Sequence, residues 1–145
     1  MRTIKLRGLK EGEWVYGGIT SNLHSPVEST QIVTNEFMEG DEENEHYIFV
    51  DVAVRTIGQF TGLHDKNGIE IYEGDIYSRL GCTYVVEMPS EWGGFYWRKI
   101  YDDWTNKNVY AKNQHSWLSE SDCTTCEIIG NIHENPELIE GKEQP

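Results

Sequence analysis

Polar and apolar residues alternate along many short stretches of the chain, a period that predicts β-strands rather than helices. The first such stretch is Thr3-Ile4-Lys5-Leu6-Arg7, in which the apolar side chains fall on one face. Further segments with a strand pattern, rich in residues that suit a pleated surface, are 13–19, 30–34, 46–54, 69–72, 83–88, 94–98, 108–112 and 127–132. Turn residues separate them, so the pattern predicts an all-β, mainly antiparallel fold.

One segment has the chemistry of a helix start. In Asn135-Pro136-Glu137 the Asn can cap the helix, Pro suits the first turn, and Glu lies near the positive end of the dipole. This predicts one short C-terminal helical turn, followed by a frayed tail at residues 140–145.

A boundary near residues 54–58 divides the pattern into two lobes. Residues 1–55 are expected to form a small N-terminal sheet and residues 56–139 a C-terminal β-barrel. One compact domain is the alternative. In the first lobe, six of the ten residues from Glu36 to Glu45 are acidic, which favours a mobile, solvated loop.

Two turns are sharply marked in the middle of the chain. Asp65-Lys66-Asn67-Gly68 has Asp at the start and Gly at the end of a tight turn. Glu73-Gly74-Asp75 then interrupts the next strand, and Gly74 supplies a backbone angle that a Cβ atom would hinder. The carboxylates of Asp65 and Asp75 are interpreted as acceptors for backbone N–H groups.

These turns carry a resemblance to a known family. The segment from Thr56 to Ile76 resembles the central signature of the YopX family, a T-G-L-x-D-x-N-G turn followed by I-Y-E-G-D-I. Residues 129–138, I-G-N-I-H-E-N-P-E-L, are similar to the closing G-N-I-Y-E-N-P-E-L-L, with His133 in place of Tyr and Ile139 in place of the final Leu. The opening Ile4-Lys5-Leu6-Arg7 resembles I-K-F-R, whereas residues 8–10 depart from the family pattern. The structural motif comprises Thr61, Gly62, Asp65, Asn67, Gly68, Tyr72, Glu73, Gly74, Asp75, Gly130, Asn131, Asn135 and Pro136.

The resemblance implies a small protein of phage or prophage origin. It also implies an all-β fold with a Src-homology-3-like barrel in the second half, and self-association into a homo-oligomer. It implies no enzymatic activity.

The charge of the chain excludes several classes of partner. Twelve basic and 25 acidic residues give a net charge of −13 and a pI near 4.7. This field repels phosphate and anionic lipid, so direct binding to nucleic acid or membrane is not expected. Apolar runs are short, so neither a signal peptide nor a membrane span is expected. Three cysteines and the lack of a glycosylation sequon indicate a reducing cytoplasm, that of the bacterial host.

Two cysteines are weak candidates for a metal site. Cys123 and Cys126 have the spacing that lets two thiolates reach one metal ion. A structural zinc needs four ligands, and the chain has no second pair of this kind. No metal and no other cofactor are therefore expected.

A group of carboxylates is the weak candidate for catalysis. Asp65, Glu70, Glu73 and Asp75 lie within eleven residues, beside His64, and paired carboxylates can hydrolyse glycosides or hold a cation. Their spacing differs from that of a calcium loop, and turn formation explains both aspartates. No nucleotide-binding, serine-hydrolase or zinc-protease motif occurs, so no enzyme is expected.

Aromatic residues are concentrated in one region of the second half, where a partner surface is the leading interpretation. Because aromatic side chains are favoured at interfaces, some should face a partner while others pack in the core. The candidates for the partner surface are Trp92, Tyr96, Trp97, Tyr101 and Trp104. The leading hypothesis is thus a non-enzymatic, self-associating module that also binds a host or phage protein. The alternatives are an acidic nucleic-acid mimic that inhibits a DNA- or RNA-binding host protein, and a carboxylate-based hydrolase.

Overall fold

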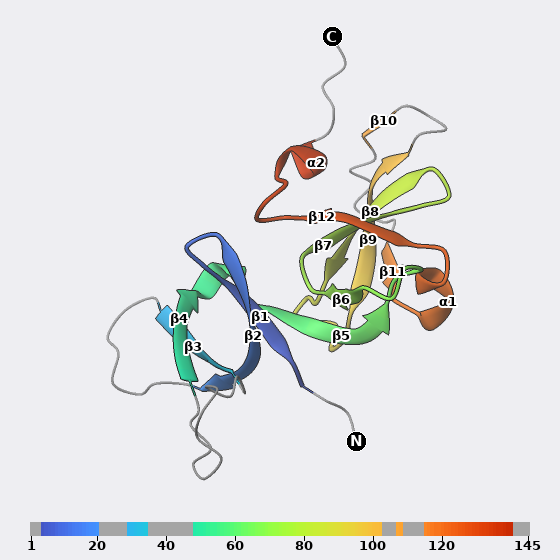
Figure 1. Ribbon diagram of the computed structural model, residues 1–145. Coiled ribbons are helices and arrows are strands. Elements are labelled where there is room, and N and C mark those ends of the chain that lie inside the picture. The colour runs from blue at the N-terminus through green and yellow to red at the C-terminus, as the bar shows by residue number, and fades with distance from the viewer. Residues whose placement is uncertain (1–3, 21–28, 35–47, 103–106, 109–114, 141–145) are drawn as a thin grey trace. The chain divides into compact units, whose positions relative to one another are not determined.

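The chain divides into two compact units, residues 1–60 and residues 61–145 (Figure 1). The computed structural model describes residues 4–20, 29–34, 48–102, 107–108 and 115–140. The acidic segment at 36–45, for which a mobile loop is expected, lies outside the described residues, as does the tail beyond residue 140.

The first unit is an antiparallel sheet with the strand order β4-β3-β2-β1. Its strands are β1 (Leu6–Lys10), β2 (Glu13–Thr20), β3 (Ser29–Thr34) and β4 (Ile48–Ala53), followed by the short 3-10 helix η1 (Val54–Thr56). Ile32 and Val52 are buried between the strands. Gly8 makes this packing possible, because a Cβ at that position would lie 2.8 Å from Val52 Cγ2.

β5 (Gly58–His64) begins in the first unit, where Gly58 and Gln59 pair with β1, and continues into the second, where it pairs with β6 (Glu70–Tyr72). The second unit also contains an antiparallel sheet with the order β10-β9-β8-β7-β12, in which β11 lies beside β9 (Figure 1). Its strands are β7 (Asp75–Arg79), β8 (Cys82–Glu87), β9 (Tyr96–Asp102), β10 (Lys107–Asn108), β11 (His115–Trp117) and β12 (Glu127–Asn131). Its described part also includes the short helices α1 (Glu120–Cys123) and α2 (Glu137–Glu140).

The predicted all-β, antiparallel fold is confirmed, but the predicted barrel is wrong. Within the described residues, β12 ends the strand order and pairs with β7 alone. Closing a barrel requires the two edge strands of one sheet to pair. Here β5 and β6 pair with each other instead of bridging the two edges, so the sheet stays open.

The helix prediction also needs correction. The short C-terminal turn after Asn135 is present as α2, but it is not the only helix start. Ser119 caps α1 in a capping box: its Oγ accepts from Asp122 N, and the Asp122 carboxylate accepts from Ser119 N. The sequence Ser119-Glu120-Ser121-Asp122 carries this signal in a form that uses Asp where Glu or Gln is usual. Among the described helices, none is long and apolar enough to cross a membrane.

The core of the second unit consists of two hydrophobic clusters. The first joins Ile71, Tyr77, Val86, Phe95, Cys123 and Cys126, with Leu63, Tyr84, Trp97, Leu118 and Ile128 packed against it. The second joins Ile76, Val85 and Ile100, with Ile132, Leu138 and Ile139 beside it. Neighbouring residues of β7 and β8 belong to different clusters, as expected for strands whose side chains alternate between two faces.

The closing motif forms a tight network after β12. The Asn131 side-chain oxygen accepts from His133 N and Glu134 N, both at 3.0 Å, while Asn131 Nδ2 donates to the Glu134 carboxylate. Asn135 Oδ1 accepts from Asn131 N. A Cβ at Gly130 would lie 2.4 Å from that same oxygen, so the bend that leads into α2 depends on glycine.

Gly74 holds the turn between β6 and β7 against β8 and against the residue that follows β12. Its N–H donates to Val86 O and its carbonyl accepts from Ile132 N, each at 2.9 Å. Its φ is +88°, and an added Cβ would lie 3.4 Å from Ile132 Cγ1. A branched side chain there would be strained by the backbone angle and would press on a packed neighbour.

Gly74→Val should lower the free energy of unfolding by about 1–3 kcal/mol, because the residue must hold a positive φ in a buried turn. Urea unfolding measures the change. Gly18→Val is the control, since Gly18 has an ordinary φ and no atom within 4 Å of its Cβ position. Equal stability of Gly74→Val and the parent would contradict the role assigned to this turn.

Candidate functional site

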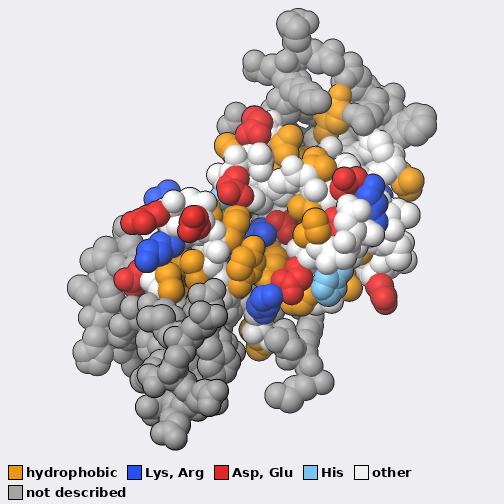
Figure 2. Space-filling view, viewed as in Figure 1, with side chains coloured by type: hydrophobic (Ala, Val, Ile, Leu, Met, Phe, Trp, Pro, Cys, Tyr) orange, Lys and Arg blue, Asp and Glu red, His pale blue; other side chains and the backbone are white. Residues whose placement is uncertain are grey.

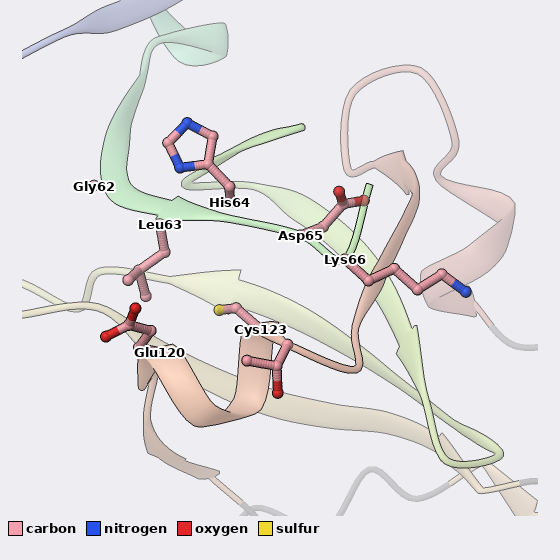
Figure 3. Close-up of a pocket in the computed structure, with 8 residues that line it drawn as sticks. Gly62, Leu63, His64, Asp65, Lys66, Glu120 and Cys123 are labelled. Carbon is pink, nitrogen blue, oxygen red and sulfur yellow. The ribbon is translucent and has the colours of Figure 1, made fainter. Parts of the chain in front are cut away.

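An open pocket lies where the end of β5 meets α1. Its volume is about 350 Å³. Leu63 points from β5 toward Glu120 and Cys123 of α1, whereas His64 points away from them (Figure 3). The full lining is Gly62, Leu63, His64, Asp65, Lys66, Glu120, Cys123 and Thr124.

The carboxylate of Asp65 is committed to the backbone. It is buried, and its Oδ1 accepts from Asn67 N at 2.8 Å and from Ile69 N at 3.0 Å. Its Oδ2 accepts from Ile128 N of β12 at 3.1 Å, a residue 63 positions further along the chain. Asp65 therefore closes the signature turn and ties it to β12.

Nearby residues of the central motif also bond to the backbone or to each other. Thr61 Oγ1 donates to Ile71 O, which joins β5 to β6. Asp75 Oδ2 accepts from Tyr72 N at 2.8 Å, and Tyr72 Oη donates to the Glu70 carboxylate. The carboxylates of Glu70 and Asp75 are therefore hydrogen-bonded within the central motif, and these contacts do not join them in a shared catalytic centre.

Replacing Asp65 should destabilise the fold strongly. Asp65→Ala leaves three N–H groups without an acceptor, which should cost about 2–3 kcal/mol of unfolding free energy. Asp65→Asn should cost less, because the amide oxygen can still accept hydrogen bonds. Urea unfolding of both variants at one pH measures the difference, and equal losses would contradict this account of the carboxylate.

The two predicted cysteine candidates lie together in the first core cluster. Cys123 is 2% exposed and Cys126 0% exposed. Burial and the neighbouring Cys126 raise the pKa of the Cys123 thiol to about 12, and burial likewise raises the pKa of Cys126. Both side chains are therefore protonated at neutral pH. Within the described part of the chain, no group of three His, Cys, Asp or Glu side chains could hold a metal ion.

These thiols should react slowly in the folded protein. The thiolate is the reactive form, so at pH 8 Cys123 should react with a disulfide reagent such as DTNB about 10²–10³ times more slowly than in urea-unfolded protein. A Cys82→Ala background removes the third thiol from the measurement. Native labelling of Cys123 and Cys126 at the unfolded rate would contradict the burial of the pair.

A second candidate site is a group of four aromatic side chains, termed here the aromatic cluster. Trp92 lies in the loop before β9, Tyr96 lies on β9, and His115 and Trp117 lie on β11. Tyr96 lies at the centre, with ring centroids 4.7 Å from Trp92 and 4.1 Å from Trp117. The His115 ring stacks on Trp92 at 4.3 Å. Tyr96 is only 9% exposed, whereas Trp92 and Trp117 are 39% and 57% exposed.

Local backbone geometry brings these rings together. Trp92 N donates to Pro89 O, and Gly93 follows with a φ of +66°, so the chain reverses before entering β9. β11 pairs with β9 in a register that puts Trp117 opposite Tyr96. Gly94 leaves space for the Trp117 ring, since a Cβ there would lie 2.3 Å from Trp117 Cζ3.

The structure distributes the predicted partner residues between different environments. Trp92 and Tyr96 belong to the aromatic cluster, while Trp97 packs against the first core cluster and lies 5.1 Å from the Tyr84 ring. Tyr101 is half-buried on β9, and Trp104 lies outside the described residues. Sequence reasoning missed His115 and Trp117, which reach the cluster only through strand pairing.

Comparisons with known proteins identify a family whose model matches this sequence and a solved structure whose fold is similar. The family model described as YopX protein matches residues 9–140. The crystal structure of protein EF1440 from Enterococcus faecalis is similar, with a TM-score of 0.53 and 22% sequence identity, over 94% of this chain and 98% of that one. At this identity the likeness bears on the fold alone. A search of curated proteins gave no significant match.

Proposed function

This chain belongs to the YopX family, as its motifs predict, and we propose that it is a non-enzymatic protein-binding module that uses the aromatic cluster as its contact site. The observation that carries the proposal is the exposure of Trp92 and Trp117, at 39% and 57%, within a set of rings in mutual contact. The partner we propose is a protein of the bacterial host or of a phage.

Exposed tryptophans held in one arrangement suit protein recognition. A tryptophan supplies a large contact area, and tryptophans are enriched among the residues that dominate binding energy. Contacts with Tyr96 and His115 hold the rings before a partner arrives. A partner then binds with less loss of side-chain freedom than a flexible surface would require.

The two alternatives derived from the sequence have less support. A hydrolase needs available carboxylates, but those of Asp65 and Asp75 accept backbone N–H groups. A nucleic-acid mimic needs an ordered row of acidic groups in place of phosphates. On the face of the molecule in Figure 2, acidic side chains are interspersed with hydrophobic and basic ones.

Self-association remains a prediction from the sequence and from the family resemblance. β4 ends the strand order of the first sheet, so its outer edge has no strand partner among the described residues, and such edges are sites of pairing between chains. Light scattering of the purified protein measures the mass directly. A mass near 16.8 kDa at tens of micromolar would contradict self-association.

Capture from a bacterial lysate tests the proposed function. The tagged parent should retain a protein partner, and Trp92→Ala combined with Trp117→Ala should lose it, because both exposed rings are removed. Ile129→Ala is the matched control: Ile129 is 42% exposed on β12, outside the aromatic cluster. Quantitative mass spectrometry of the retained proteins gives the comparison.

Thermal melting must first show that each variant is folded. Retention of the same partner by the folded double variant, at the level of the parent, would contradict the assignment of the site. A parent that retains no protein above the background of the tag would contradict the function itself.

A further inference from the structure

We infer that the aromatic cluster recognises the cationic side chains of a basic protein segment, with Lys or Arg groups stacked on Trp92 and Trp117. This rests on the proposed function and names the chemistry of the partner. Three features of the protein support it: the charges beside the cluster on its face of the sheet, the charge of the second unit, and the cation–aromatic contacts elsewhere in this chain.

Strand register assigns the charges of this face. Side chains alternate along β9, so Tyr96 and Arg98 share one face and Lys99 lies on the other. On neighbouring strands, Trp117 and Glu87 are both directly opposite Tyr96 and therefore share its face. Beside the aromatic cluster, this face therefore carries the acidic Glu87 and the basic Arg98.

Arg98, the basic residue beside the aromatic cluster, is already neutralised. Arg98 Nε and Nη2 both donate to Glu87 Oε1, at 2.9 and 2.7 Å. Glu91, next to Trp92 in the chain, is exposed. Arg98 therefore adds no net positive charge that would repel an incoming cation, and Glu91 adds an attraction.

The charge of the whole unit acts in the same direction. Residues 61–145 contain 15 acidic and 7 basic residues, a net charge of −8 within the −13 of the chain. A field of this sign accelerates the approach of basic partners. At the aromatic cluster it disfavours a second copy of this chain, which carries the same charge, and it disfavours nucleic acid.

Aromatic rings attract cations through their negative faces, and the described residues of the first unit include two such contacts. The Arg7 guanidinium lies 4.2 Å from the Trp14 ring centroid, and Lys5 Nζ lies 5.5 Å from that of Tyr16. In the described part of the second unit, no Lys or Arg of the chain lies over Trp92 or Trp117 in this way. Their exposed rings are thus open to a cation from another molecule.

Titration with a synthetic peptide of Arg-Gly-Ser repeats tests the inference. Isothermal titration calorimetry should detect binding to the parent protein that weakens as salt is added. Trp92→Leu combined with Trp117→Leu keeps apolar side chains and the net charge but removes the aromatic faces. It should lower the affinity about tenfold, at about 0.5–1 kcal/mol for each exposed cation–π contact, whereas Ile129→Ala should leave it unchanged.

A peptide with citrulline in place of arginine separates charge from shape. It keeps the planar end group without the positive charge, and it should not bind. Equal affinity of the folded double-leucine variant and the parent would overturn the inference, because charge alone would then explain binding. Equal binding of the citrulline peptide, or a tryptophan-dependent dimer of the free protein in light scattering, would also overturn it.

Competition between the arginine peptide and the captured partner tests this inference separately from the proposed function. The arginine peptide should displace the captured partner from the parent protein. A partner whose capture needs Trp92 and Trp117, but which the peptide cannot displace at saturation, would leave the protein-binding function standing and refute its cationic chemistry. If capture of the partner does not depend on the two tryptophans while peptide binding does, the assignment of the partner site is refuted and only the cation site remains.

Discussion

The carboxylate of Asp65 is the contact on which the arrangement of the second unit most depends. Its two oxygens accept from the turn that it begins and from Ile128 on β12. The next residue, Lys66, donates its N–H to Cys126 O, so the turn also holds the segment between α1 and β12. A buried carboxylate is costly unless its oxygens are hydrogen-bonded, and these N–H groups would themselves be unsatisfied without it. Loss of Asp65 therefore loosens the cover of the first core cluster, including both buried cysteines.

Local chemistry explains which parts of the fold could be predicted from the sequence. The Asp65–Gly68 turn and the helix after Asn135 are specified by residues close together in the chain, and both are present. The β7 strand (Asp75–Arg79) was not predicted, because Asp75, Ser78 and Arg79 obscure its strand pattern. The barrel prediction failed for a different reason. Closure depends on which edges pair, and alternation of polar and apolar residues predicts strands without specifying their neighbours.

The aromatic cluster shows the same limit of sequence patterns at the candidate site: they do not specify which strands become neighbours. A dense run of aromatic residues indicated an interface, and Trp92 and Tyr96 are indeed together. Because side chains alternate along a strand, residues adjacent in the chain nevertheless lie on opposite faces of the sheet. Tyr96 faces the aromatic cluster, while Trp97 packs against the first core cluster. His115 and Trp117 join through pairing of β11 with β9, across a stretch of sequence that carries no local signal for this register. Gly94 is the sequence feature that could have indicated a close contact here, since it leaves room for a large ring.

The aromatic cluster lies on the same face of β9 as part of the second core cluster. Tyr96, Arg98 and Ile100 alternate onto the same face of β9, and Ile100 belongs to the second core cluster with Val85. Tyr96 is itself only 9% exposed and contacts both Trp92 and Trp117, so its substitution should disturb the packing of both rings. Trp92 and Trp117 lie at the outer end of this series, where large fractions of their surfaces are free of contacts. Substitution of the tryptophans should therefore affect the core less, and this separation makes them the residues at which the proposed recognition and folding can be measured independently.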